Sequence, residues 1–191
     1  MRTAKCVAQD RPTEVRAYLA ATPGSAGEEQ AYEVFAEKLR KCMPNVDFSG
    51  VGNMQAARGA LTMRFEHSTL RGALAESMLR EGKTELMLDK IMLGDDGMFV
   101  AERFHGERSD TIERVFSLGF AGCVMGHNAG ALEALFQTEP GSDNEKQAIM
   151  AMSPSFGQCV MEGQSLKLRA PTLRNQLAEA AYYAVSLEAP Q

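Results

Sequence analysis

An internal repeat constrains this chain more than any other feature of its sequence. Residues 4–42 align without gaps on residues 121–159, and 11 of these 39 positions are identical. A second match joins TLRGALAE at 69–76 to TLRNQLAE at 172–179, where six of eight positions agree. Because a repeated sequence folds into repeated structural units, we predict a protein built from two homologous repeats.

The same matches divide the chain. Residues 1–80 are predicted to form the first repeat, residues 81–114 an acidic linker, and residues 115–191 the second repeat. The linker holds GDDG at 94–97 between two apolar runs, and an Asp-Gly turn in this setting predicts a β-hairpin. A chain of 191 residues has room for two small domains of this kind.

Each repeat carries the signals of about four helices. Pro-Gly turns lead into Ser-x-x-Glu capping boxes at Ser25 and Ser142, and apolar residues recur at helical spacing after them. Pro154 is expected to interrupt the third helix of the second repeat. Residues 60–65 and 165–169 alternate apolar and polar side chains, which predicts short β segments before each last helix. The fold class is therefore mainly α, and the predicted helices cover residues 2–9, 12–21, 26–42 and 69–81, then 115–126, 129–138, 143–152 and 172–187.

The four cysteines occupy equivalent places in the two repeats, 36 residues apart in each. An antiparallel pair of helices between them would bring Cys6 to Cys42 and Cys123 to Cys159, so we predict two disulfides. The alternative is four buried thiols that act as small apolar residues. Metal binding is not expected, because the chain has no C-x-x-C pair and we expect no histidine at ligand spacing from a cysteine.

Composition excludes several classes of protein. The net charge is −5, which argues against a nucleic-acid binder, because such proteins need basic patches that displace counterions from phosphates. No apolar run approaches the roughly 18 residues of a membrane span. No nucleotide-binding or hydrolase motif occurs, so no cofactor is expected.

The chain has three histidines, and packing or exposure explains each of them. His67 could act as a general base, but a surface histidine at a loop end is the simpler interpretation. His105 lies in the linker, and His127 with Asn128 is expected to cap the following helix.

An arginine and a glutamate recur in the last helix of both repeats. The pairs are Arg71 with Glu76 and Arg174 with Glu179. A guanidinium can bind an anion through two parallel bonds, so a shared anion site is one hypothesis. Recurrence in both repeats favours a structural role instead, as a partly buried ion pair or a bond to loop carbonyls.

The repeated motifs resemble a group of uncharacterised exported proteins of sphingomonad-type alphaproteobacteria. The residues that carry the resemblance are Cys6-Val7, Pro23-Gly24-Ser25, Cys42, 63–65 and 70–76, together with Cys123-Val124, Pro140-Gly141-Ser142, Cys159, 166–168, Leu173-Arg174 and 177–179. The resemblance implies export and no particular reaction.

Disulfides and this resemblance together predict a periplasmic or secreted protein. The first residues (MRTAKCV) show no apolar leader, so a cytoplasmic protein with reduced thiols is the alternative. The leading hypothesis for function is a non-enzymatic interaction module that binds another envelope protein, because helical repeats commonly present surfaces to other proteins. The alternatives are a hydrolase with a site between the repeats and a carrier of a small apolar ligand.

Overall fold

A computed structural model of the chain describes residues 2–44, 66–81, 109–160 and 168–188. Within these ranges the protein is helical, and no strand occurs. The fold class predicted from the sequence is confirmed. The predicted β segment at 60–65 and the hairpin at 94–97 lie outside the described residues, as do residues 165–167 of the second β segment.

The described helices fall into two sets with the same order. The first half contains α1 (Arg2–Asp10), α2 (Pro12–Ala20), α3 (Ala26–Cys42) and α4 (His67–Glu81). The second half contains α6 (Ser109–His127), α7 (Ala129–Gln137), α8 (Asp143–Met152), a short 3₁₀ turn η2 (Ser153–Ser155), α9 (Phe156–Cys159) and α10 (Ala170–Glu188).

Two sequence signals act locally as predicted. The hydroxyl oxygens of Ser25 and Ser142 accept the backbone N–H of the third residue of α3 and α8, which starts both helices. Pro154 stands in η2, so the segment that matches the single helix α3 is broken into α8 and α9. The largest error in a predicted boundary is at α6, which begins at residue 109 and not at 115. Helices α4 and α10 each begin two residues before their predicted starts, at His67 and Ala170.

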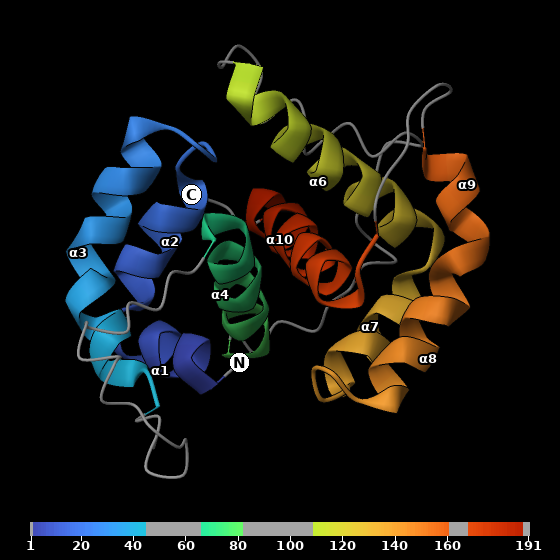
Figure 1. Cartoon of the computed structure of the whole chain (residues 1–191), viewed down its shortest axis with the longest axis horizontal. Coiled ribbons are helices and arrows are strands. Elements are labelled where there is room, and N and C mark those ends of the chain that lie inside the picture. Colours follow the sequence, from blue (N-terminus) through green and yellow to red (C-terminus); the bar gives the residue numbers. More distant parts are fainter. Residues whose placement is uncertain (1, 45–65, 82–108, 161–167, 189–191) are drawn as a thin grey trace, which may run out of the picture.

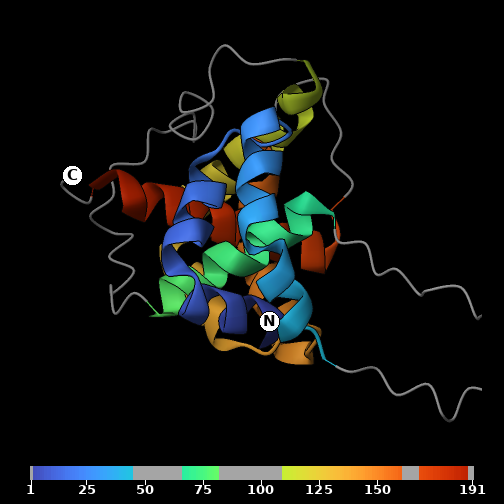
Figure 2. The same ribbon diagram turned by 90° about the vertical axis from the view of Figure 1, so that its left-hand side faces the viewer.

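The last helices of the two halves, α4 and α10, cross at the centre of the molecule (Figure 1). Helices α1 to α3 lie on one side of this pair, and α6 to α9 lie on the other. Figure 2, which turns the first half toward the viewer, shows α2 and α3 running across α4. Both α1 and α2 contact α4, while α6 contacts α10.

Each half has its own apolar core, and the central helices join the two cores. Val7, Leu19 and Phe35 belong to the first core, which is completed by Leu74 and its neighbours on α4. In return, Leu79 of α4 belongs to the core of the second half, and Tyr182 of α10 packs against the core of the first half. The two halves therefore share buried apolar surface on both sides of the crossing.

Two disulfides, one within each half, join outer helices with the pairing predicted from the sequence. Cys6 is bonded to Cys42 with a Cα–Cα distance of 5.8 Å, and Cys123 to Cys159 with a Cα–Cα distance of 5.6 Å. In the first half the bond joins the middle of α1 to the last residue of α3. In the second half it joins α6 to the last residue of α9.

Candidate functional site

Two arginines at the helix crossing are buried almost completely. Arg71 of α4 has no exposed surface, and its Nε donates to Glu179 Oε1 of α10 at 2.7 Å. Its Nη1 donates to Glu28 Oε1 of α3 at 2.9 Å. One guanidinium therefore joins a carboxylate of its own half to a carboxylate of the other half.

The remaining donors of Arg71 satisfy the end of α2. They reach the carbonyl oxygens of Tyr18, Leu19 and Ala21 at 2.9, 2.8 and 3.1 Å, and the hydroxyl of Tyr183. The last carbonyls of a helix have no partner within the helix and carry its partial negative charge. A buried cation at this place supplies both the hydrogen bonds and the opposite charge.

Arg174 of α10 makes the equivalent contacts in the second half. Its Nε and Nη2 donate to the two oxygens of Glu76 at 2.8 and 2.6 Å, and Nη1 donates to Glu145 Oε1 at 3.0 Å. It also donates to the hydroxyl and the carbonyl oxygen of Thr138, which follows α7, at 3.0 Å each. We call Arg71, Glu76, Arg174, Glu179, Glu28 and Glu145 the reciprocal network.

The network exchanges partners between the halves. Arg71 binds Glu179, the counterpart of Glu76, while Arg174 binds Glu76, the counterpart of Glu179. Such an exchange is the contact pattern of a two-fold axis. At the crossing, a Cβ on Gly72 would lie only 2.3 Å from the Cβ of Asn175, its own counterpart. Equivalent positions of α4 and α10 therefore meet at the crossing, where one side chain is absent and the other fills the space.

The Pro-Gly turns before α3 and α8 orient the capping-box carboxylates toward the arginines. Gly24 has φ 78°, and its N–H donates to Glu28 Oε2 at 2.7 Å. Gly141 has φ 81°, and its N–H holds Glu145 Oε2 at the same distance. Positive φ is a conformation that glycine adopts at little cost. The repeated Pro-Gly-Ser-x-x-Glu motif thus positions a buried carboxylate as well as starting a helix.

Two further arginines balance the charge. Arg114 of α6 binds Glu179 Oε2, and Arg80 of α4 binds Glu76 Oε1 at 2.8 Å. The four arginines and the four buried glutamates then sum to zero. Among the described residues, no buried side-chain nitrogen or oxygen lacks a hydrogen-bond partner.

Three groups at the crossing have perturbed pKa values: Glu179 of the network and the neighbouring Tyr18 and Tyr183. Burial alone would raise the pKa of Glu179, but Arg114 and Arg71 hold that pKa below its ordinary value of 4.5. Burial, and next the Glu28 carboxylate, raise the pKa of Tyr18 well above its ordinary range. Burial and Glu179 do the same for Tyr183. Both hydroxyls stay protonated at neutral pH.

An open groove of about 500 Å³ lies at the start of α3 and α4, next to this network. We call it the His67 groove. Its lining consists of Pro23, Gly24, Ser25, Ala26, Glu28, Glu29, His67, Ser68 and Arg114. A smaller hollow of about 260 Å³ shares Ser68 and Arg114 with it and extends between α4, α6 and α10. The two hollows therefore adjoin along the first turn of α4 and reach the boundary between the halves.

His67 is oriented by neighbours from α2 and α3. Its Nδ1 lies 3.0 Å from the Tyr18 hydroxyl, and its ring packs against the Tyr32 ring with 5.1 Å between centroids. Its Nε2 lies 3.6 Å from Glu29 Oε2, and Nδ1 lies 3.9 Å from Glu28 Oε2. The interpretation of His67 as a plain surface residue at a loop end is therefore incomplete, because the side chain contacts residues of both α2 and α3. Its counterpart in the second repeat is Ala170.

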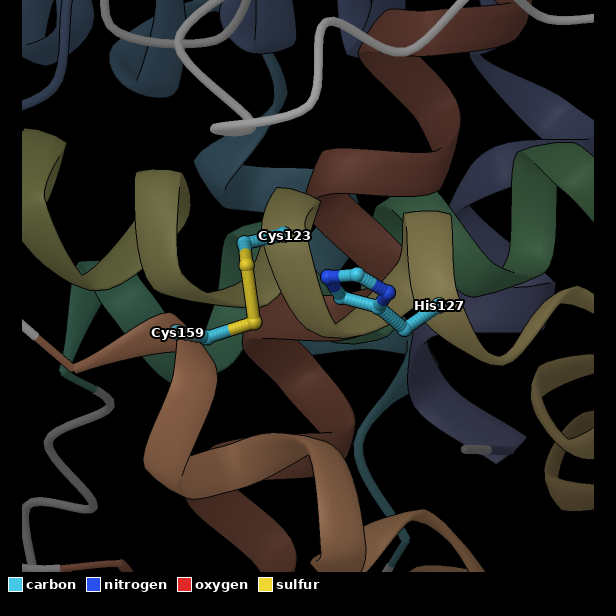
Figure 3. Close-up of side chains that lie close together, drawn as sticks. All are labelled: Cys123, His127 and Cys159. Atoms are coloured by element: carbon cyan, nitrogen blue, oxygen red, sulfur yellow. A yellow bond between two sulfur atoms is a disulfide. The ribbon is translucent and has the colours of Figure 1, made fainter.

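The second disulfide has an imidazole beside it (Figure 3). His127 ends α6 and lies four residues after Cys123, one helical turn away. The ligand atoms of His127, Cys123 and Cys159 lie within 4.8 Å of one another. The expectation that no histidine would stand at ligand spacing from a cysteine was wrong. Both sulfur atoms are bonded to each other, so in this form they hold no metal.

The predicted cap of α7 is also wrong. Asn128 is the cap residue, but its side chain makes no capping bond. It donates instead to the Val124 carbonyl at 2.8 Å and to the Ser155 hydroxyl at 2.6 Å. His105 lies outside the described residues.

The sequence indicated both arginines and both partner glutamates of the crossing, but it did not predict which arginine binds which glutamate. Glu28 and Glu145 were interpreted only as caps, and Arg114 was not singled out. Glu28 and Glu145 occupy equivalent positions in the two repeats, and so do Arg71 and Arg174. These two matches together could have indicated that the glutamates and the arginines are partners.

The chain matches no protein-family model, and comparisons with curated proteins and with solved structures found no match either. Its function therefore has to be argued from the site.

Proposed function

We propose that this protein is a non-enzymatic exported module that binds a segment of another protein in the His67 groove. The observation that carries the proposal is the open groove of about 500 Å³, continued by the second hollow toward the other half. Ion pairs hold two of its lining side chains, because Arg71 binds Glu28 and Glu179 binds Arg114, and the Cys6–Cys42 disulfide joins α3 to α1. Disulfides are typical of an oxidising compartment, which supports a periplasmic or secreted location.

The charges of the groove favour a basic partner segment. Arg114 is held by Glu179, and Glu28 is held by Arg71 and the Gly24 N–H. The side chain of Glu29, by contrast, is 61% exposed at the groove. Glu66 lines the adjoining hollow and is also exposed. A lysine or arginine of a partner would find these carboxylates accessible, and the net charge of −5 favours such an encounter.

The test compares capture of partners by three forms of the disulfide-bonded chain. Wild type, Glu29→Lys and Glu33→Lys are immobilised and exposed to an envelope extract, and bound proteins are identified by mass spectrometry. Glu33 is exposed on α3 but does not line the groove, so its variant carries the same charge change outside the site. A partner bound by wild type and Glu33→Lys, and lost with Glu29→Lys, supports the proposal. Equal capture by all three forms, or no specific capture, contradicts it.

A hydrolase remains the second candidate, and one observation favours it. His67 shares the groove with Ser25, Ser68 and Glu29, which are the residue types of acid–base and nucleophilic catalysis. The Ser25 hydroxyl, however, is engaged by the Glu28 N–H. Hydrolysis of ester or peptide substrates by wild type, and its loss in His67→Ala, would favour the enzyme over the binding module.

A carrier of an apolar ligand has less support. Both hollows are open, and both include charged side chains in their lining. An apolar ligand is usually bound in a site that buries most of its surface.

No described helix is both long and apolar enough to cross a bilayer.

A further inference from the structure

The second disulfide and His127 form a cluster that the proposed function does not use. Cys123 is buried on α6, Cys159 is half-buried at the end of α9, and His127 is exposed. Figure 3 shows the imidazole of His127 beside the sulfur–sulfur bond. The cluster is therefore accessible from solvent through its histidine.

Two thiolates and an imidazole are a donor set that Zn²⁺ prefers. Zinc bonds of about 2.3 Å to sulfur and about 2.0 Å to nitrogen imply ligand atoms roughly 3.6–3.8 Å apart at tetrahedral angles. The three ligand atoms here already lie within 4.8 Å of one another. Separation of the two sulfur atoms after reduction is thus the main change required.

We infer that reduction of the Cys123–Cys159 bond creates a zinc site, with His127 as the third protein ligand and water in the fourth position. A dithiol reductant supplies two electrons and two protons, becomes a disulfide itself and leaves two thiols. Zn²⁺ then displaces the two thiol protons and binds both thiolates and the neutral imidazole. The bound ion bridges α6 and α9 in place of the disulfide, so it keeps this half closed under reducing conditions.

The first half provides an internal control. Its disulfide has the same sequence separation of 36, but Asp10 stands where the second half has His127. The Asp10 carboxylate lies 3.0 Å from Lys38 Nζ and 3.5 Å from Arg11 Nε. A carboxylate held by two cations is a poorer zinc ligand than an imidazole, so the site belongs to the second half alone.

The test uses the full chain reduced with a phosphine, which avoids the metal affinity of dithiol reagents. Wild type and His127→Ala are titrated with Co²⁺ without oxygen, and Zn²⁺ then competes for the site. Both forms carry four thiols, so they differ only in the imidazole. Loss of even an indirect partner of a metal commonly weakens binding about 10–100-fold, so loss of a ligand should weaken it by at least about tenfold.

Wild type is expected to bind one Co²⁺ with thiolate-to-metal charge-transfer absorption, and His127→Ala at least about tenfold more weakly. The unreduced protein should show no such absorption. Equal binding by both reduced forms, or none by wild type, overturns the inference.

Reduction can also unfold the chain, so helical content is followed by far-ultraviolet circular dichroism. Zinc that restores the helical signal in wild type and not in His127→Ala supports the site. Restoration in both forms or in neither overturns it. The result is independent of partner binding in the His67 groove.

Discussion

Replacement of Arg71 by methionine is the most direct test of the reciprocal network. The side chain is fully buried and donates to two carboxylates, three carbonyl oxygens and one hydroxyl. Methionine fills a similar space without any donor. Glu28 keeps the Gly24 N–H and Glu179 keeps Arg114, but the carbonyls at the end of α2 lose their shared donor.

The expected loss of stability follows from these contacts. Removal of one partner from a buried ion pair costs about 3–5 kcal/mol. Each buried carbonyl left without a donor adds about 1–3 kcal/mol, and water that enters the site offsets part of this cost. We therefore expect a loss near the upper end of the ion-pair range, about 5 kcal/mol, which lowers the melting temperature of a chain of this size by roughly 10–20 °C.

Urea unfolding followed by far-ultraviolet circular dichroism measures the effect, because the protein has no tryptophan to report by fluorescence. Lys146→Met is the matched control. It removes an ion pair with Asp143, whose side chain is 88% exposed, and such a surface pair contributes little, so the urea midpoint should stay unchanged. A loss of less than about 1 kcal/mol in Arg71→Met would refute the structural role of the network. If that variant does not fold, Glu28→Gln should lose about 1–3 kcal/mol by the same reasoning.

Three further predictions concern the crossing, the disulfides and acid. Gly72→Ala should destabilise the protein by about 1–3 kcal/mol, because its Cβ would overlap the backbone of α10. Gly119→Ala should stabilise α6 by about 0.5–1 kcal/mol, since no atom lies within 4 Å of the added Cβ. Thermal unfolding of the two variants measures both changes. The Cys6→Ala, Cys42→Ala double variant should lose about 3–4 kcal/mol in urea unfolding, and an unchanged midpoint would show that the bond does not constrain the chain. Because the pKa of Glu179 is lowered in the folded state, its contribution is full above about pH 4.5 and is lost as the pH falls further. The urea midpoint should therefore drop between about pH 6 and about pH 3, and by less in Glu179→Gln; an equal drop in both forms would contradict this assignment.

Local signals made the helices and disulfides predictable. The capping boxes at Ser25 and Ser142 and the interruption at Pro154 depend on residues within one or two turns, so the sequence reveals them. The disulfide pairing followed because each repeat offers only two cysteines, at the ends of neighbouring helices.

Contacts between the halves could not be predicted in the same way. Arg71 pairs with a glutamate 108 residues away, and Arg174 pairs with one 98 residues away. Helical periodicity relates only residues a few positions apart, so it cannot predict these pairs. The spacing of five between Arg71 and Glu76 disfavours a pair within α4, because neighbours on a helix surface are three or four residues apart, but it does not identify the partner outside the helix. His127 was missed for another reason: its place beside the disulfide depends on α6 continuing to residue 127.

The exchange of carboxylates also bears on how two copies of one sequence can drift apart. Loss of Glu76 leaves the buried arginine of the opposite half with one carboxylate in place of two, and loss of Glu179 does the same in reverse. Neither copy is free to mutate these positions alone. The octapeptides at the crossing accordingly agree at six of eight positions, against 11 of 39 in the outer helices. One of the two differences, Gly72 against Asn175, falls where a pair of equal side chains would collide.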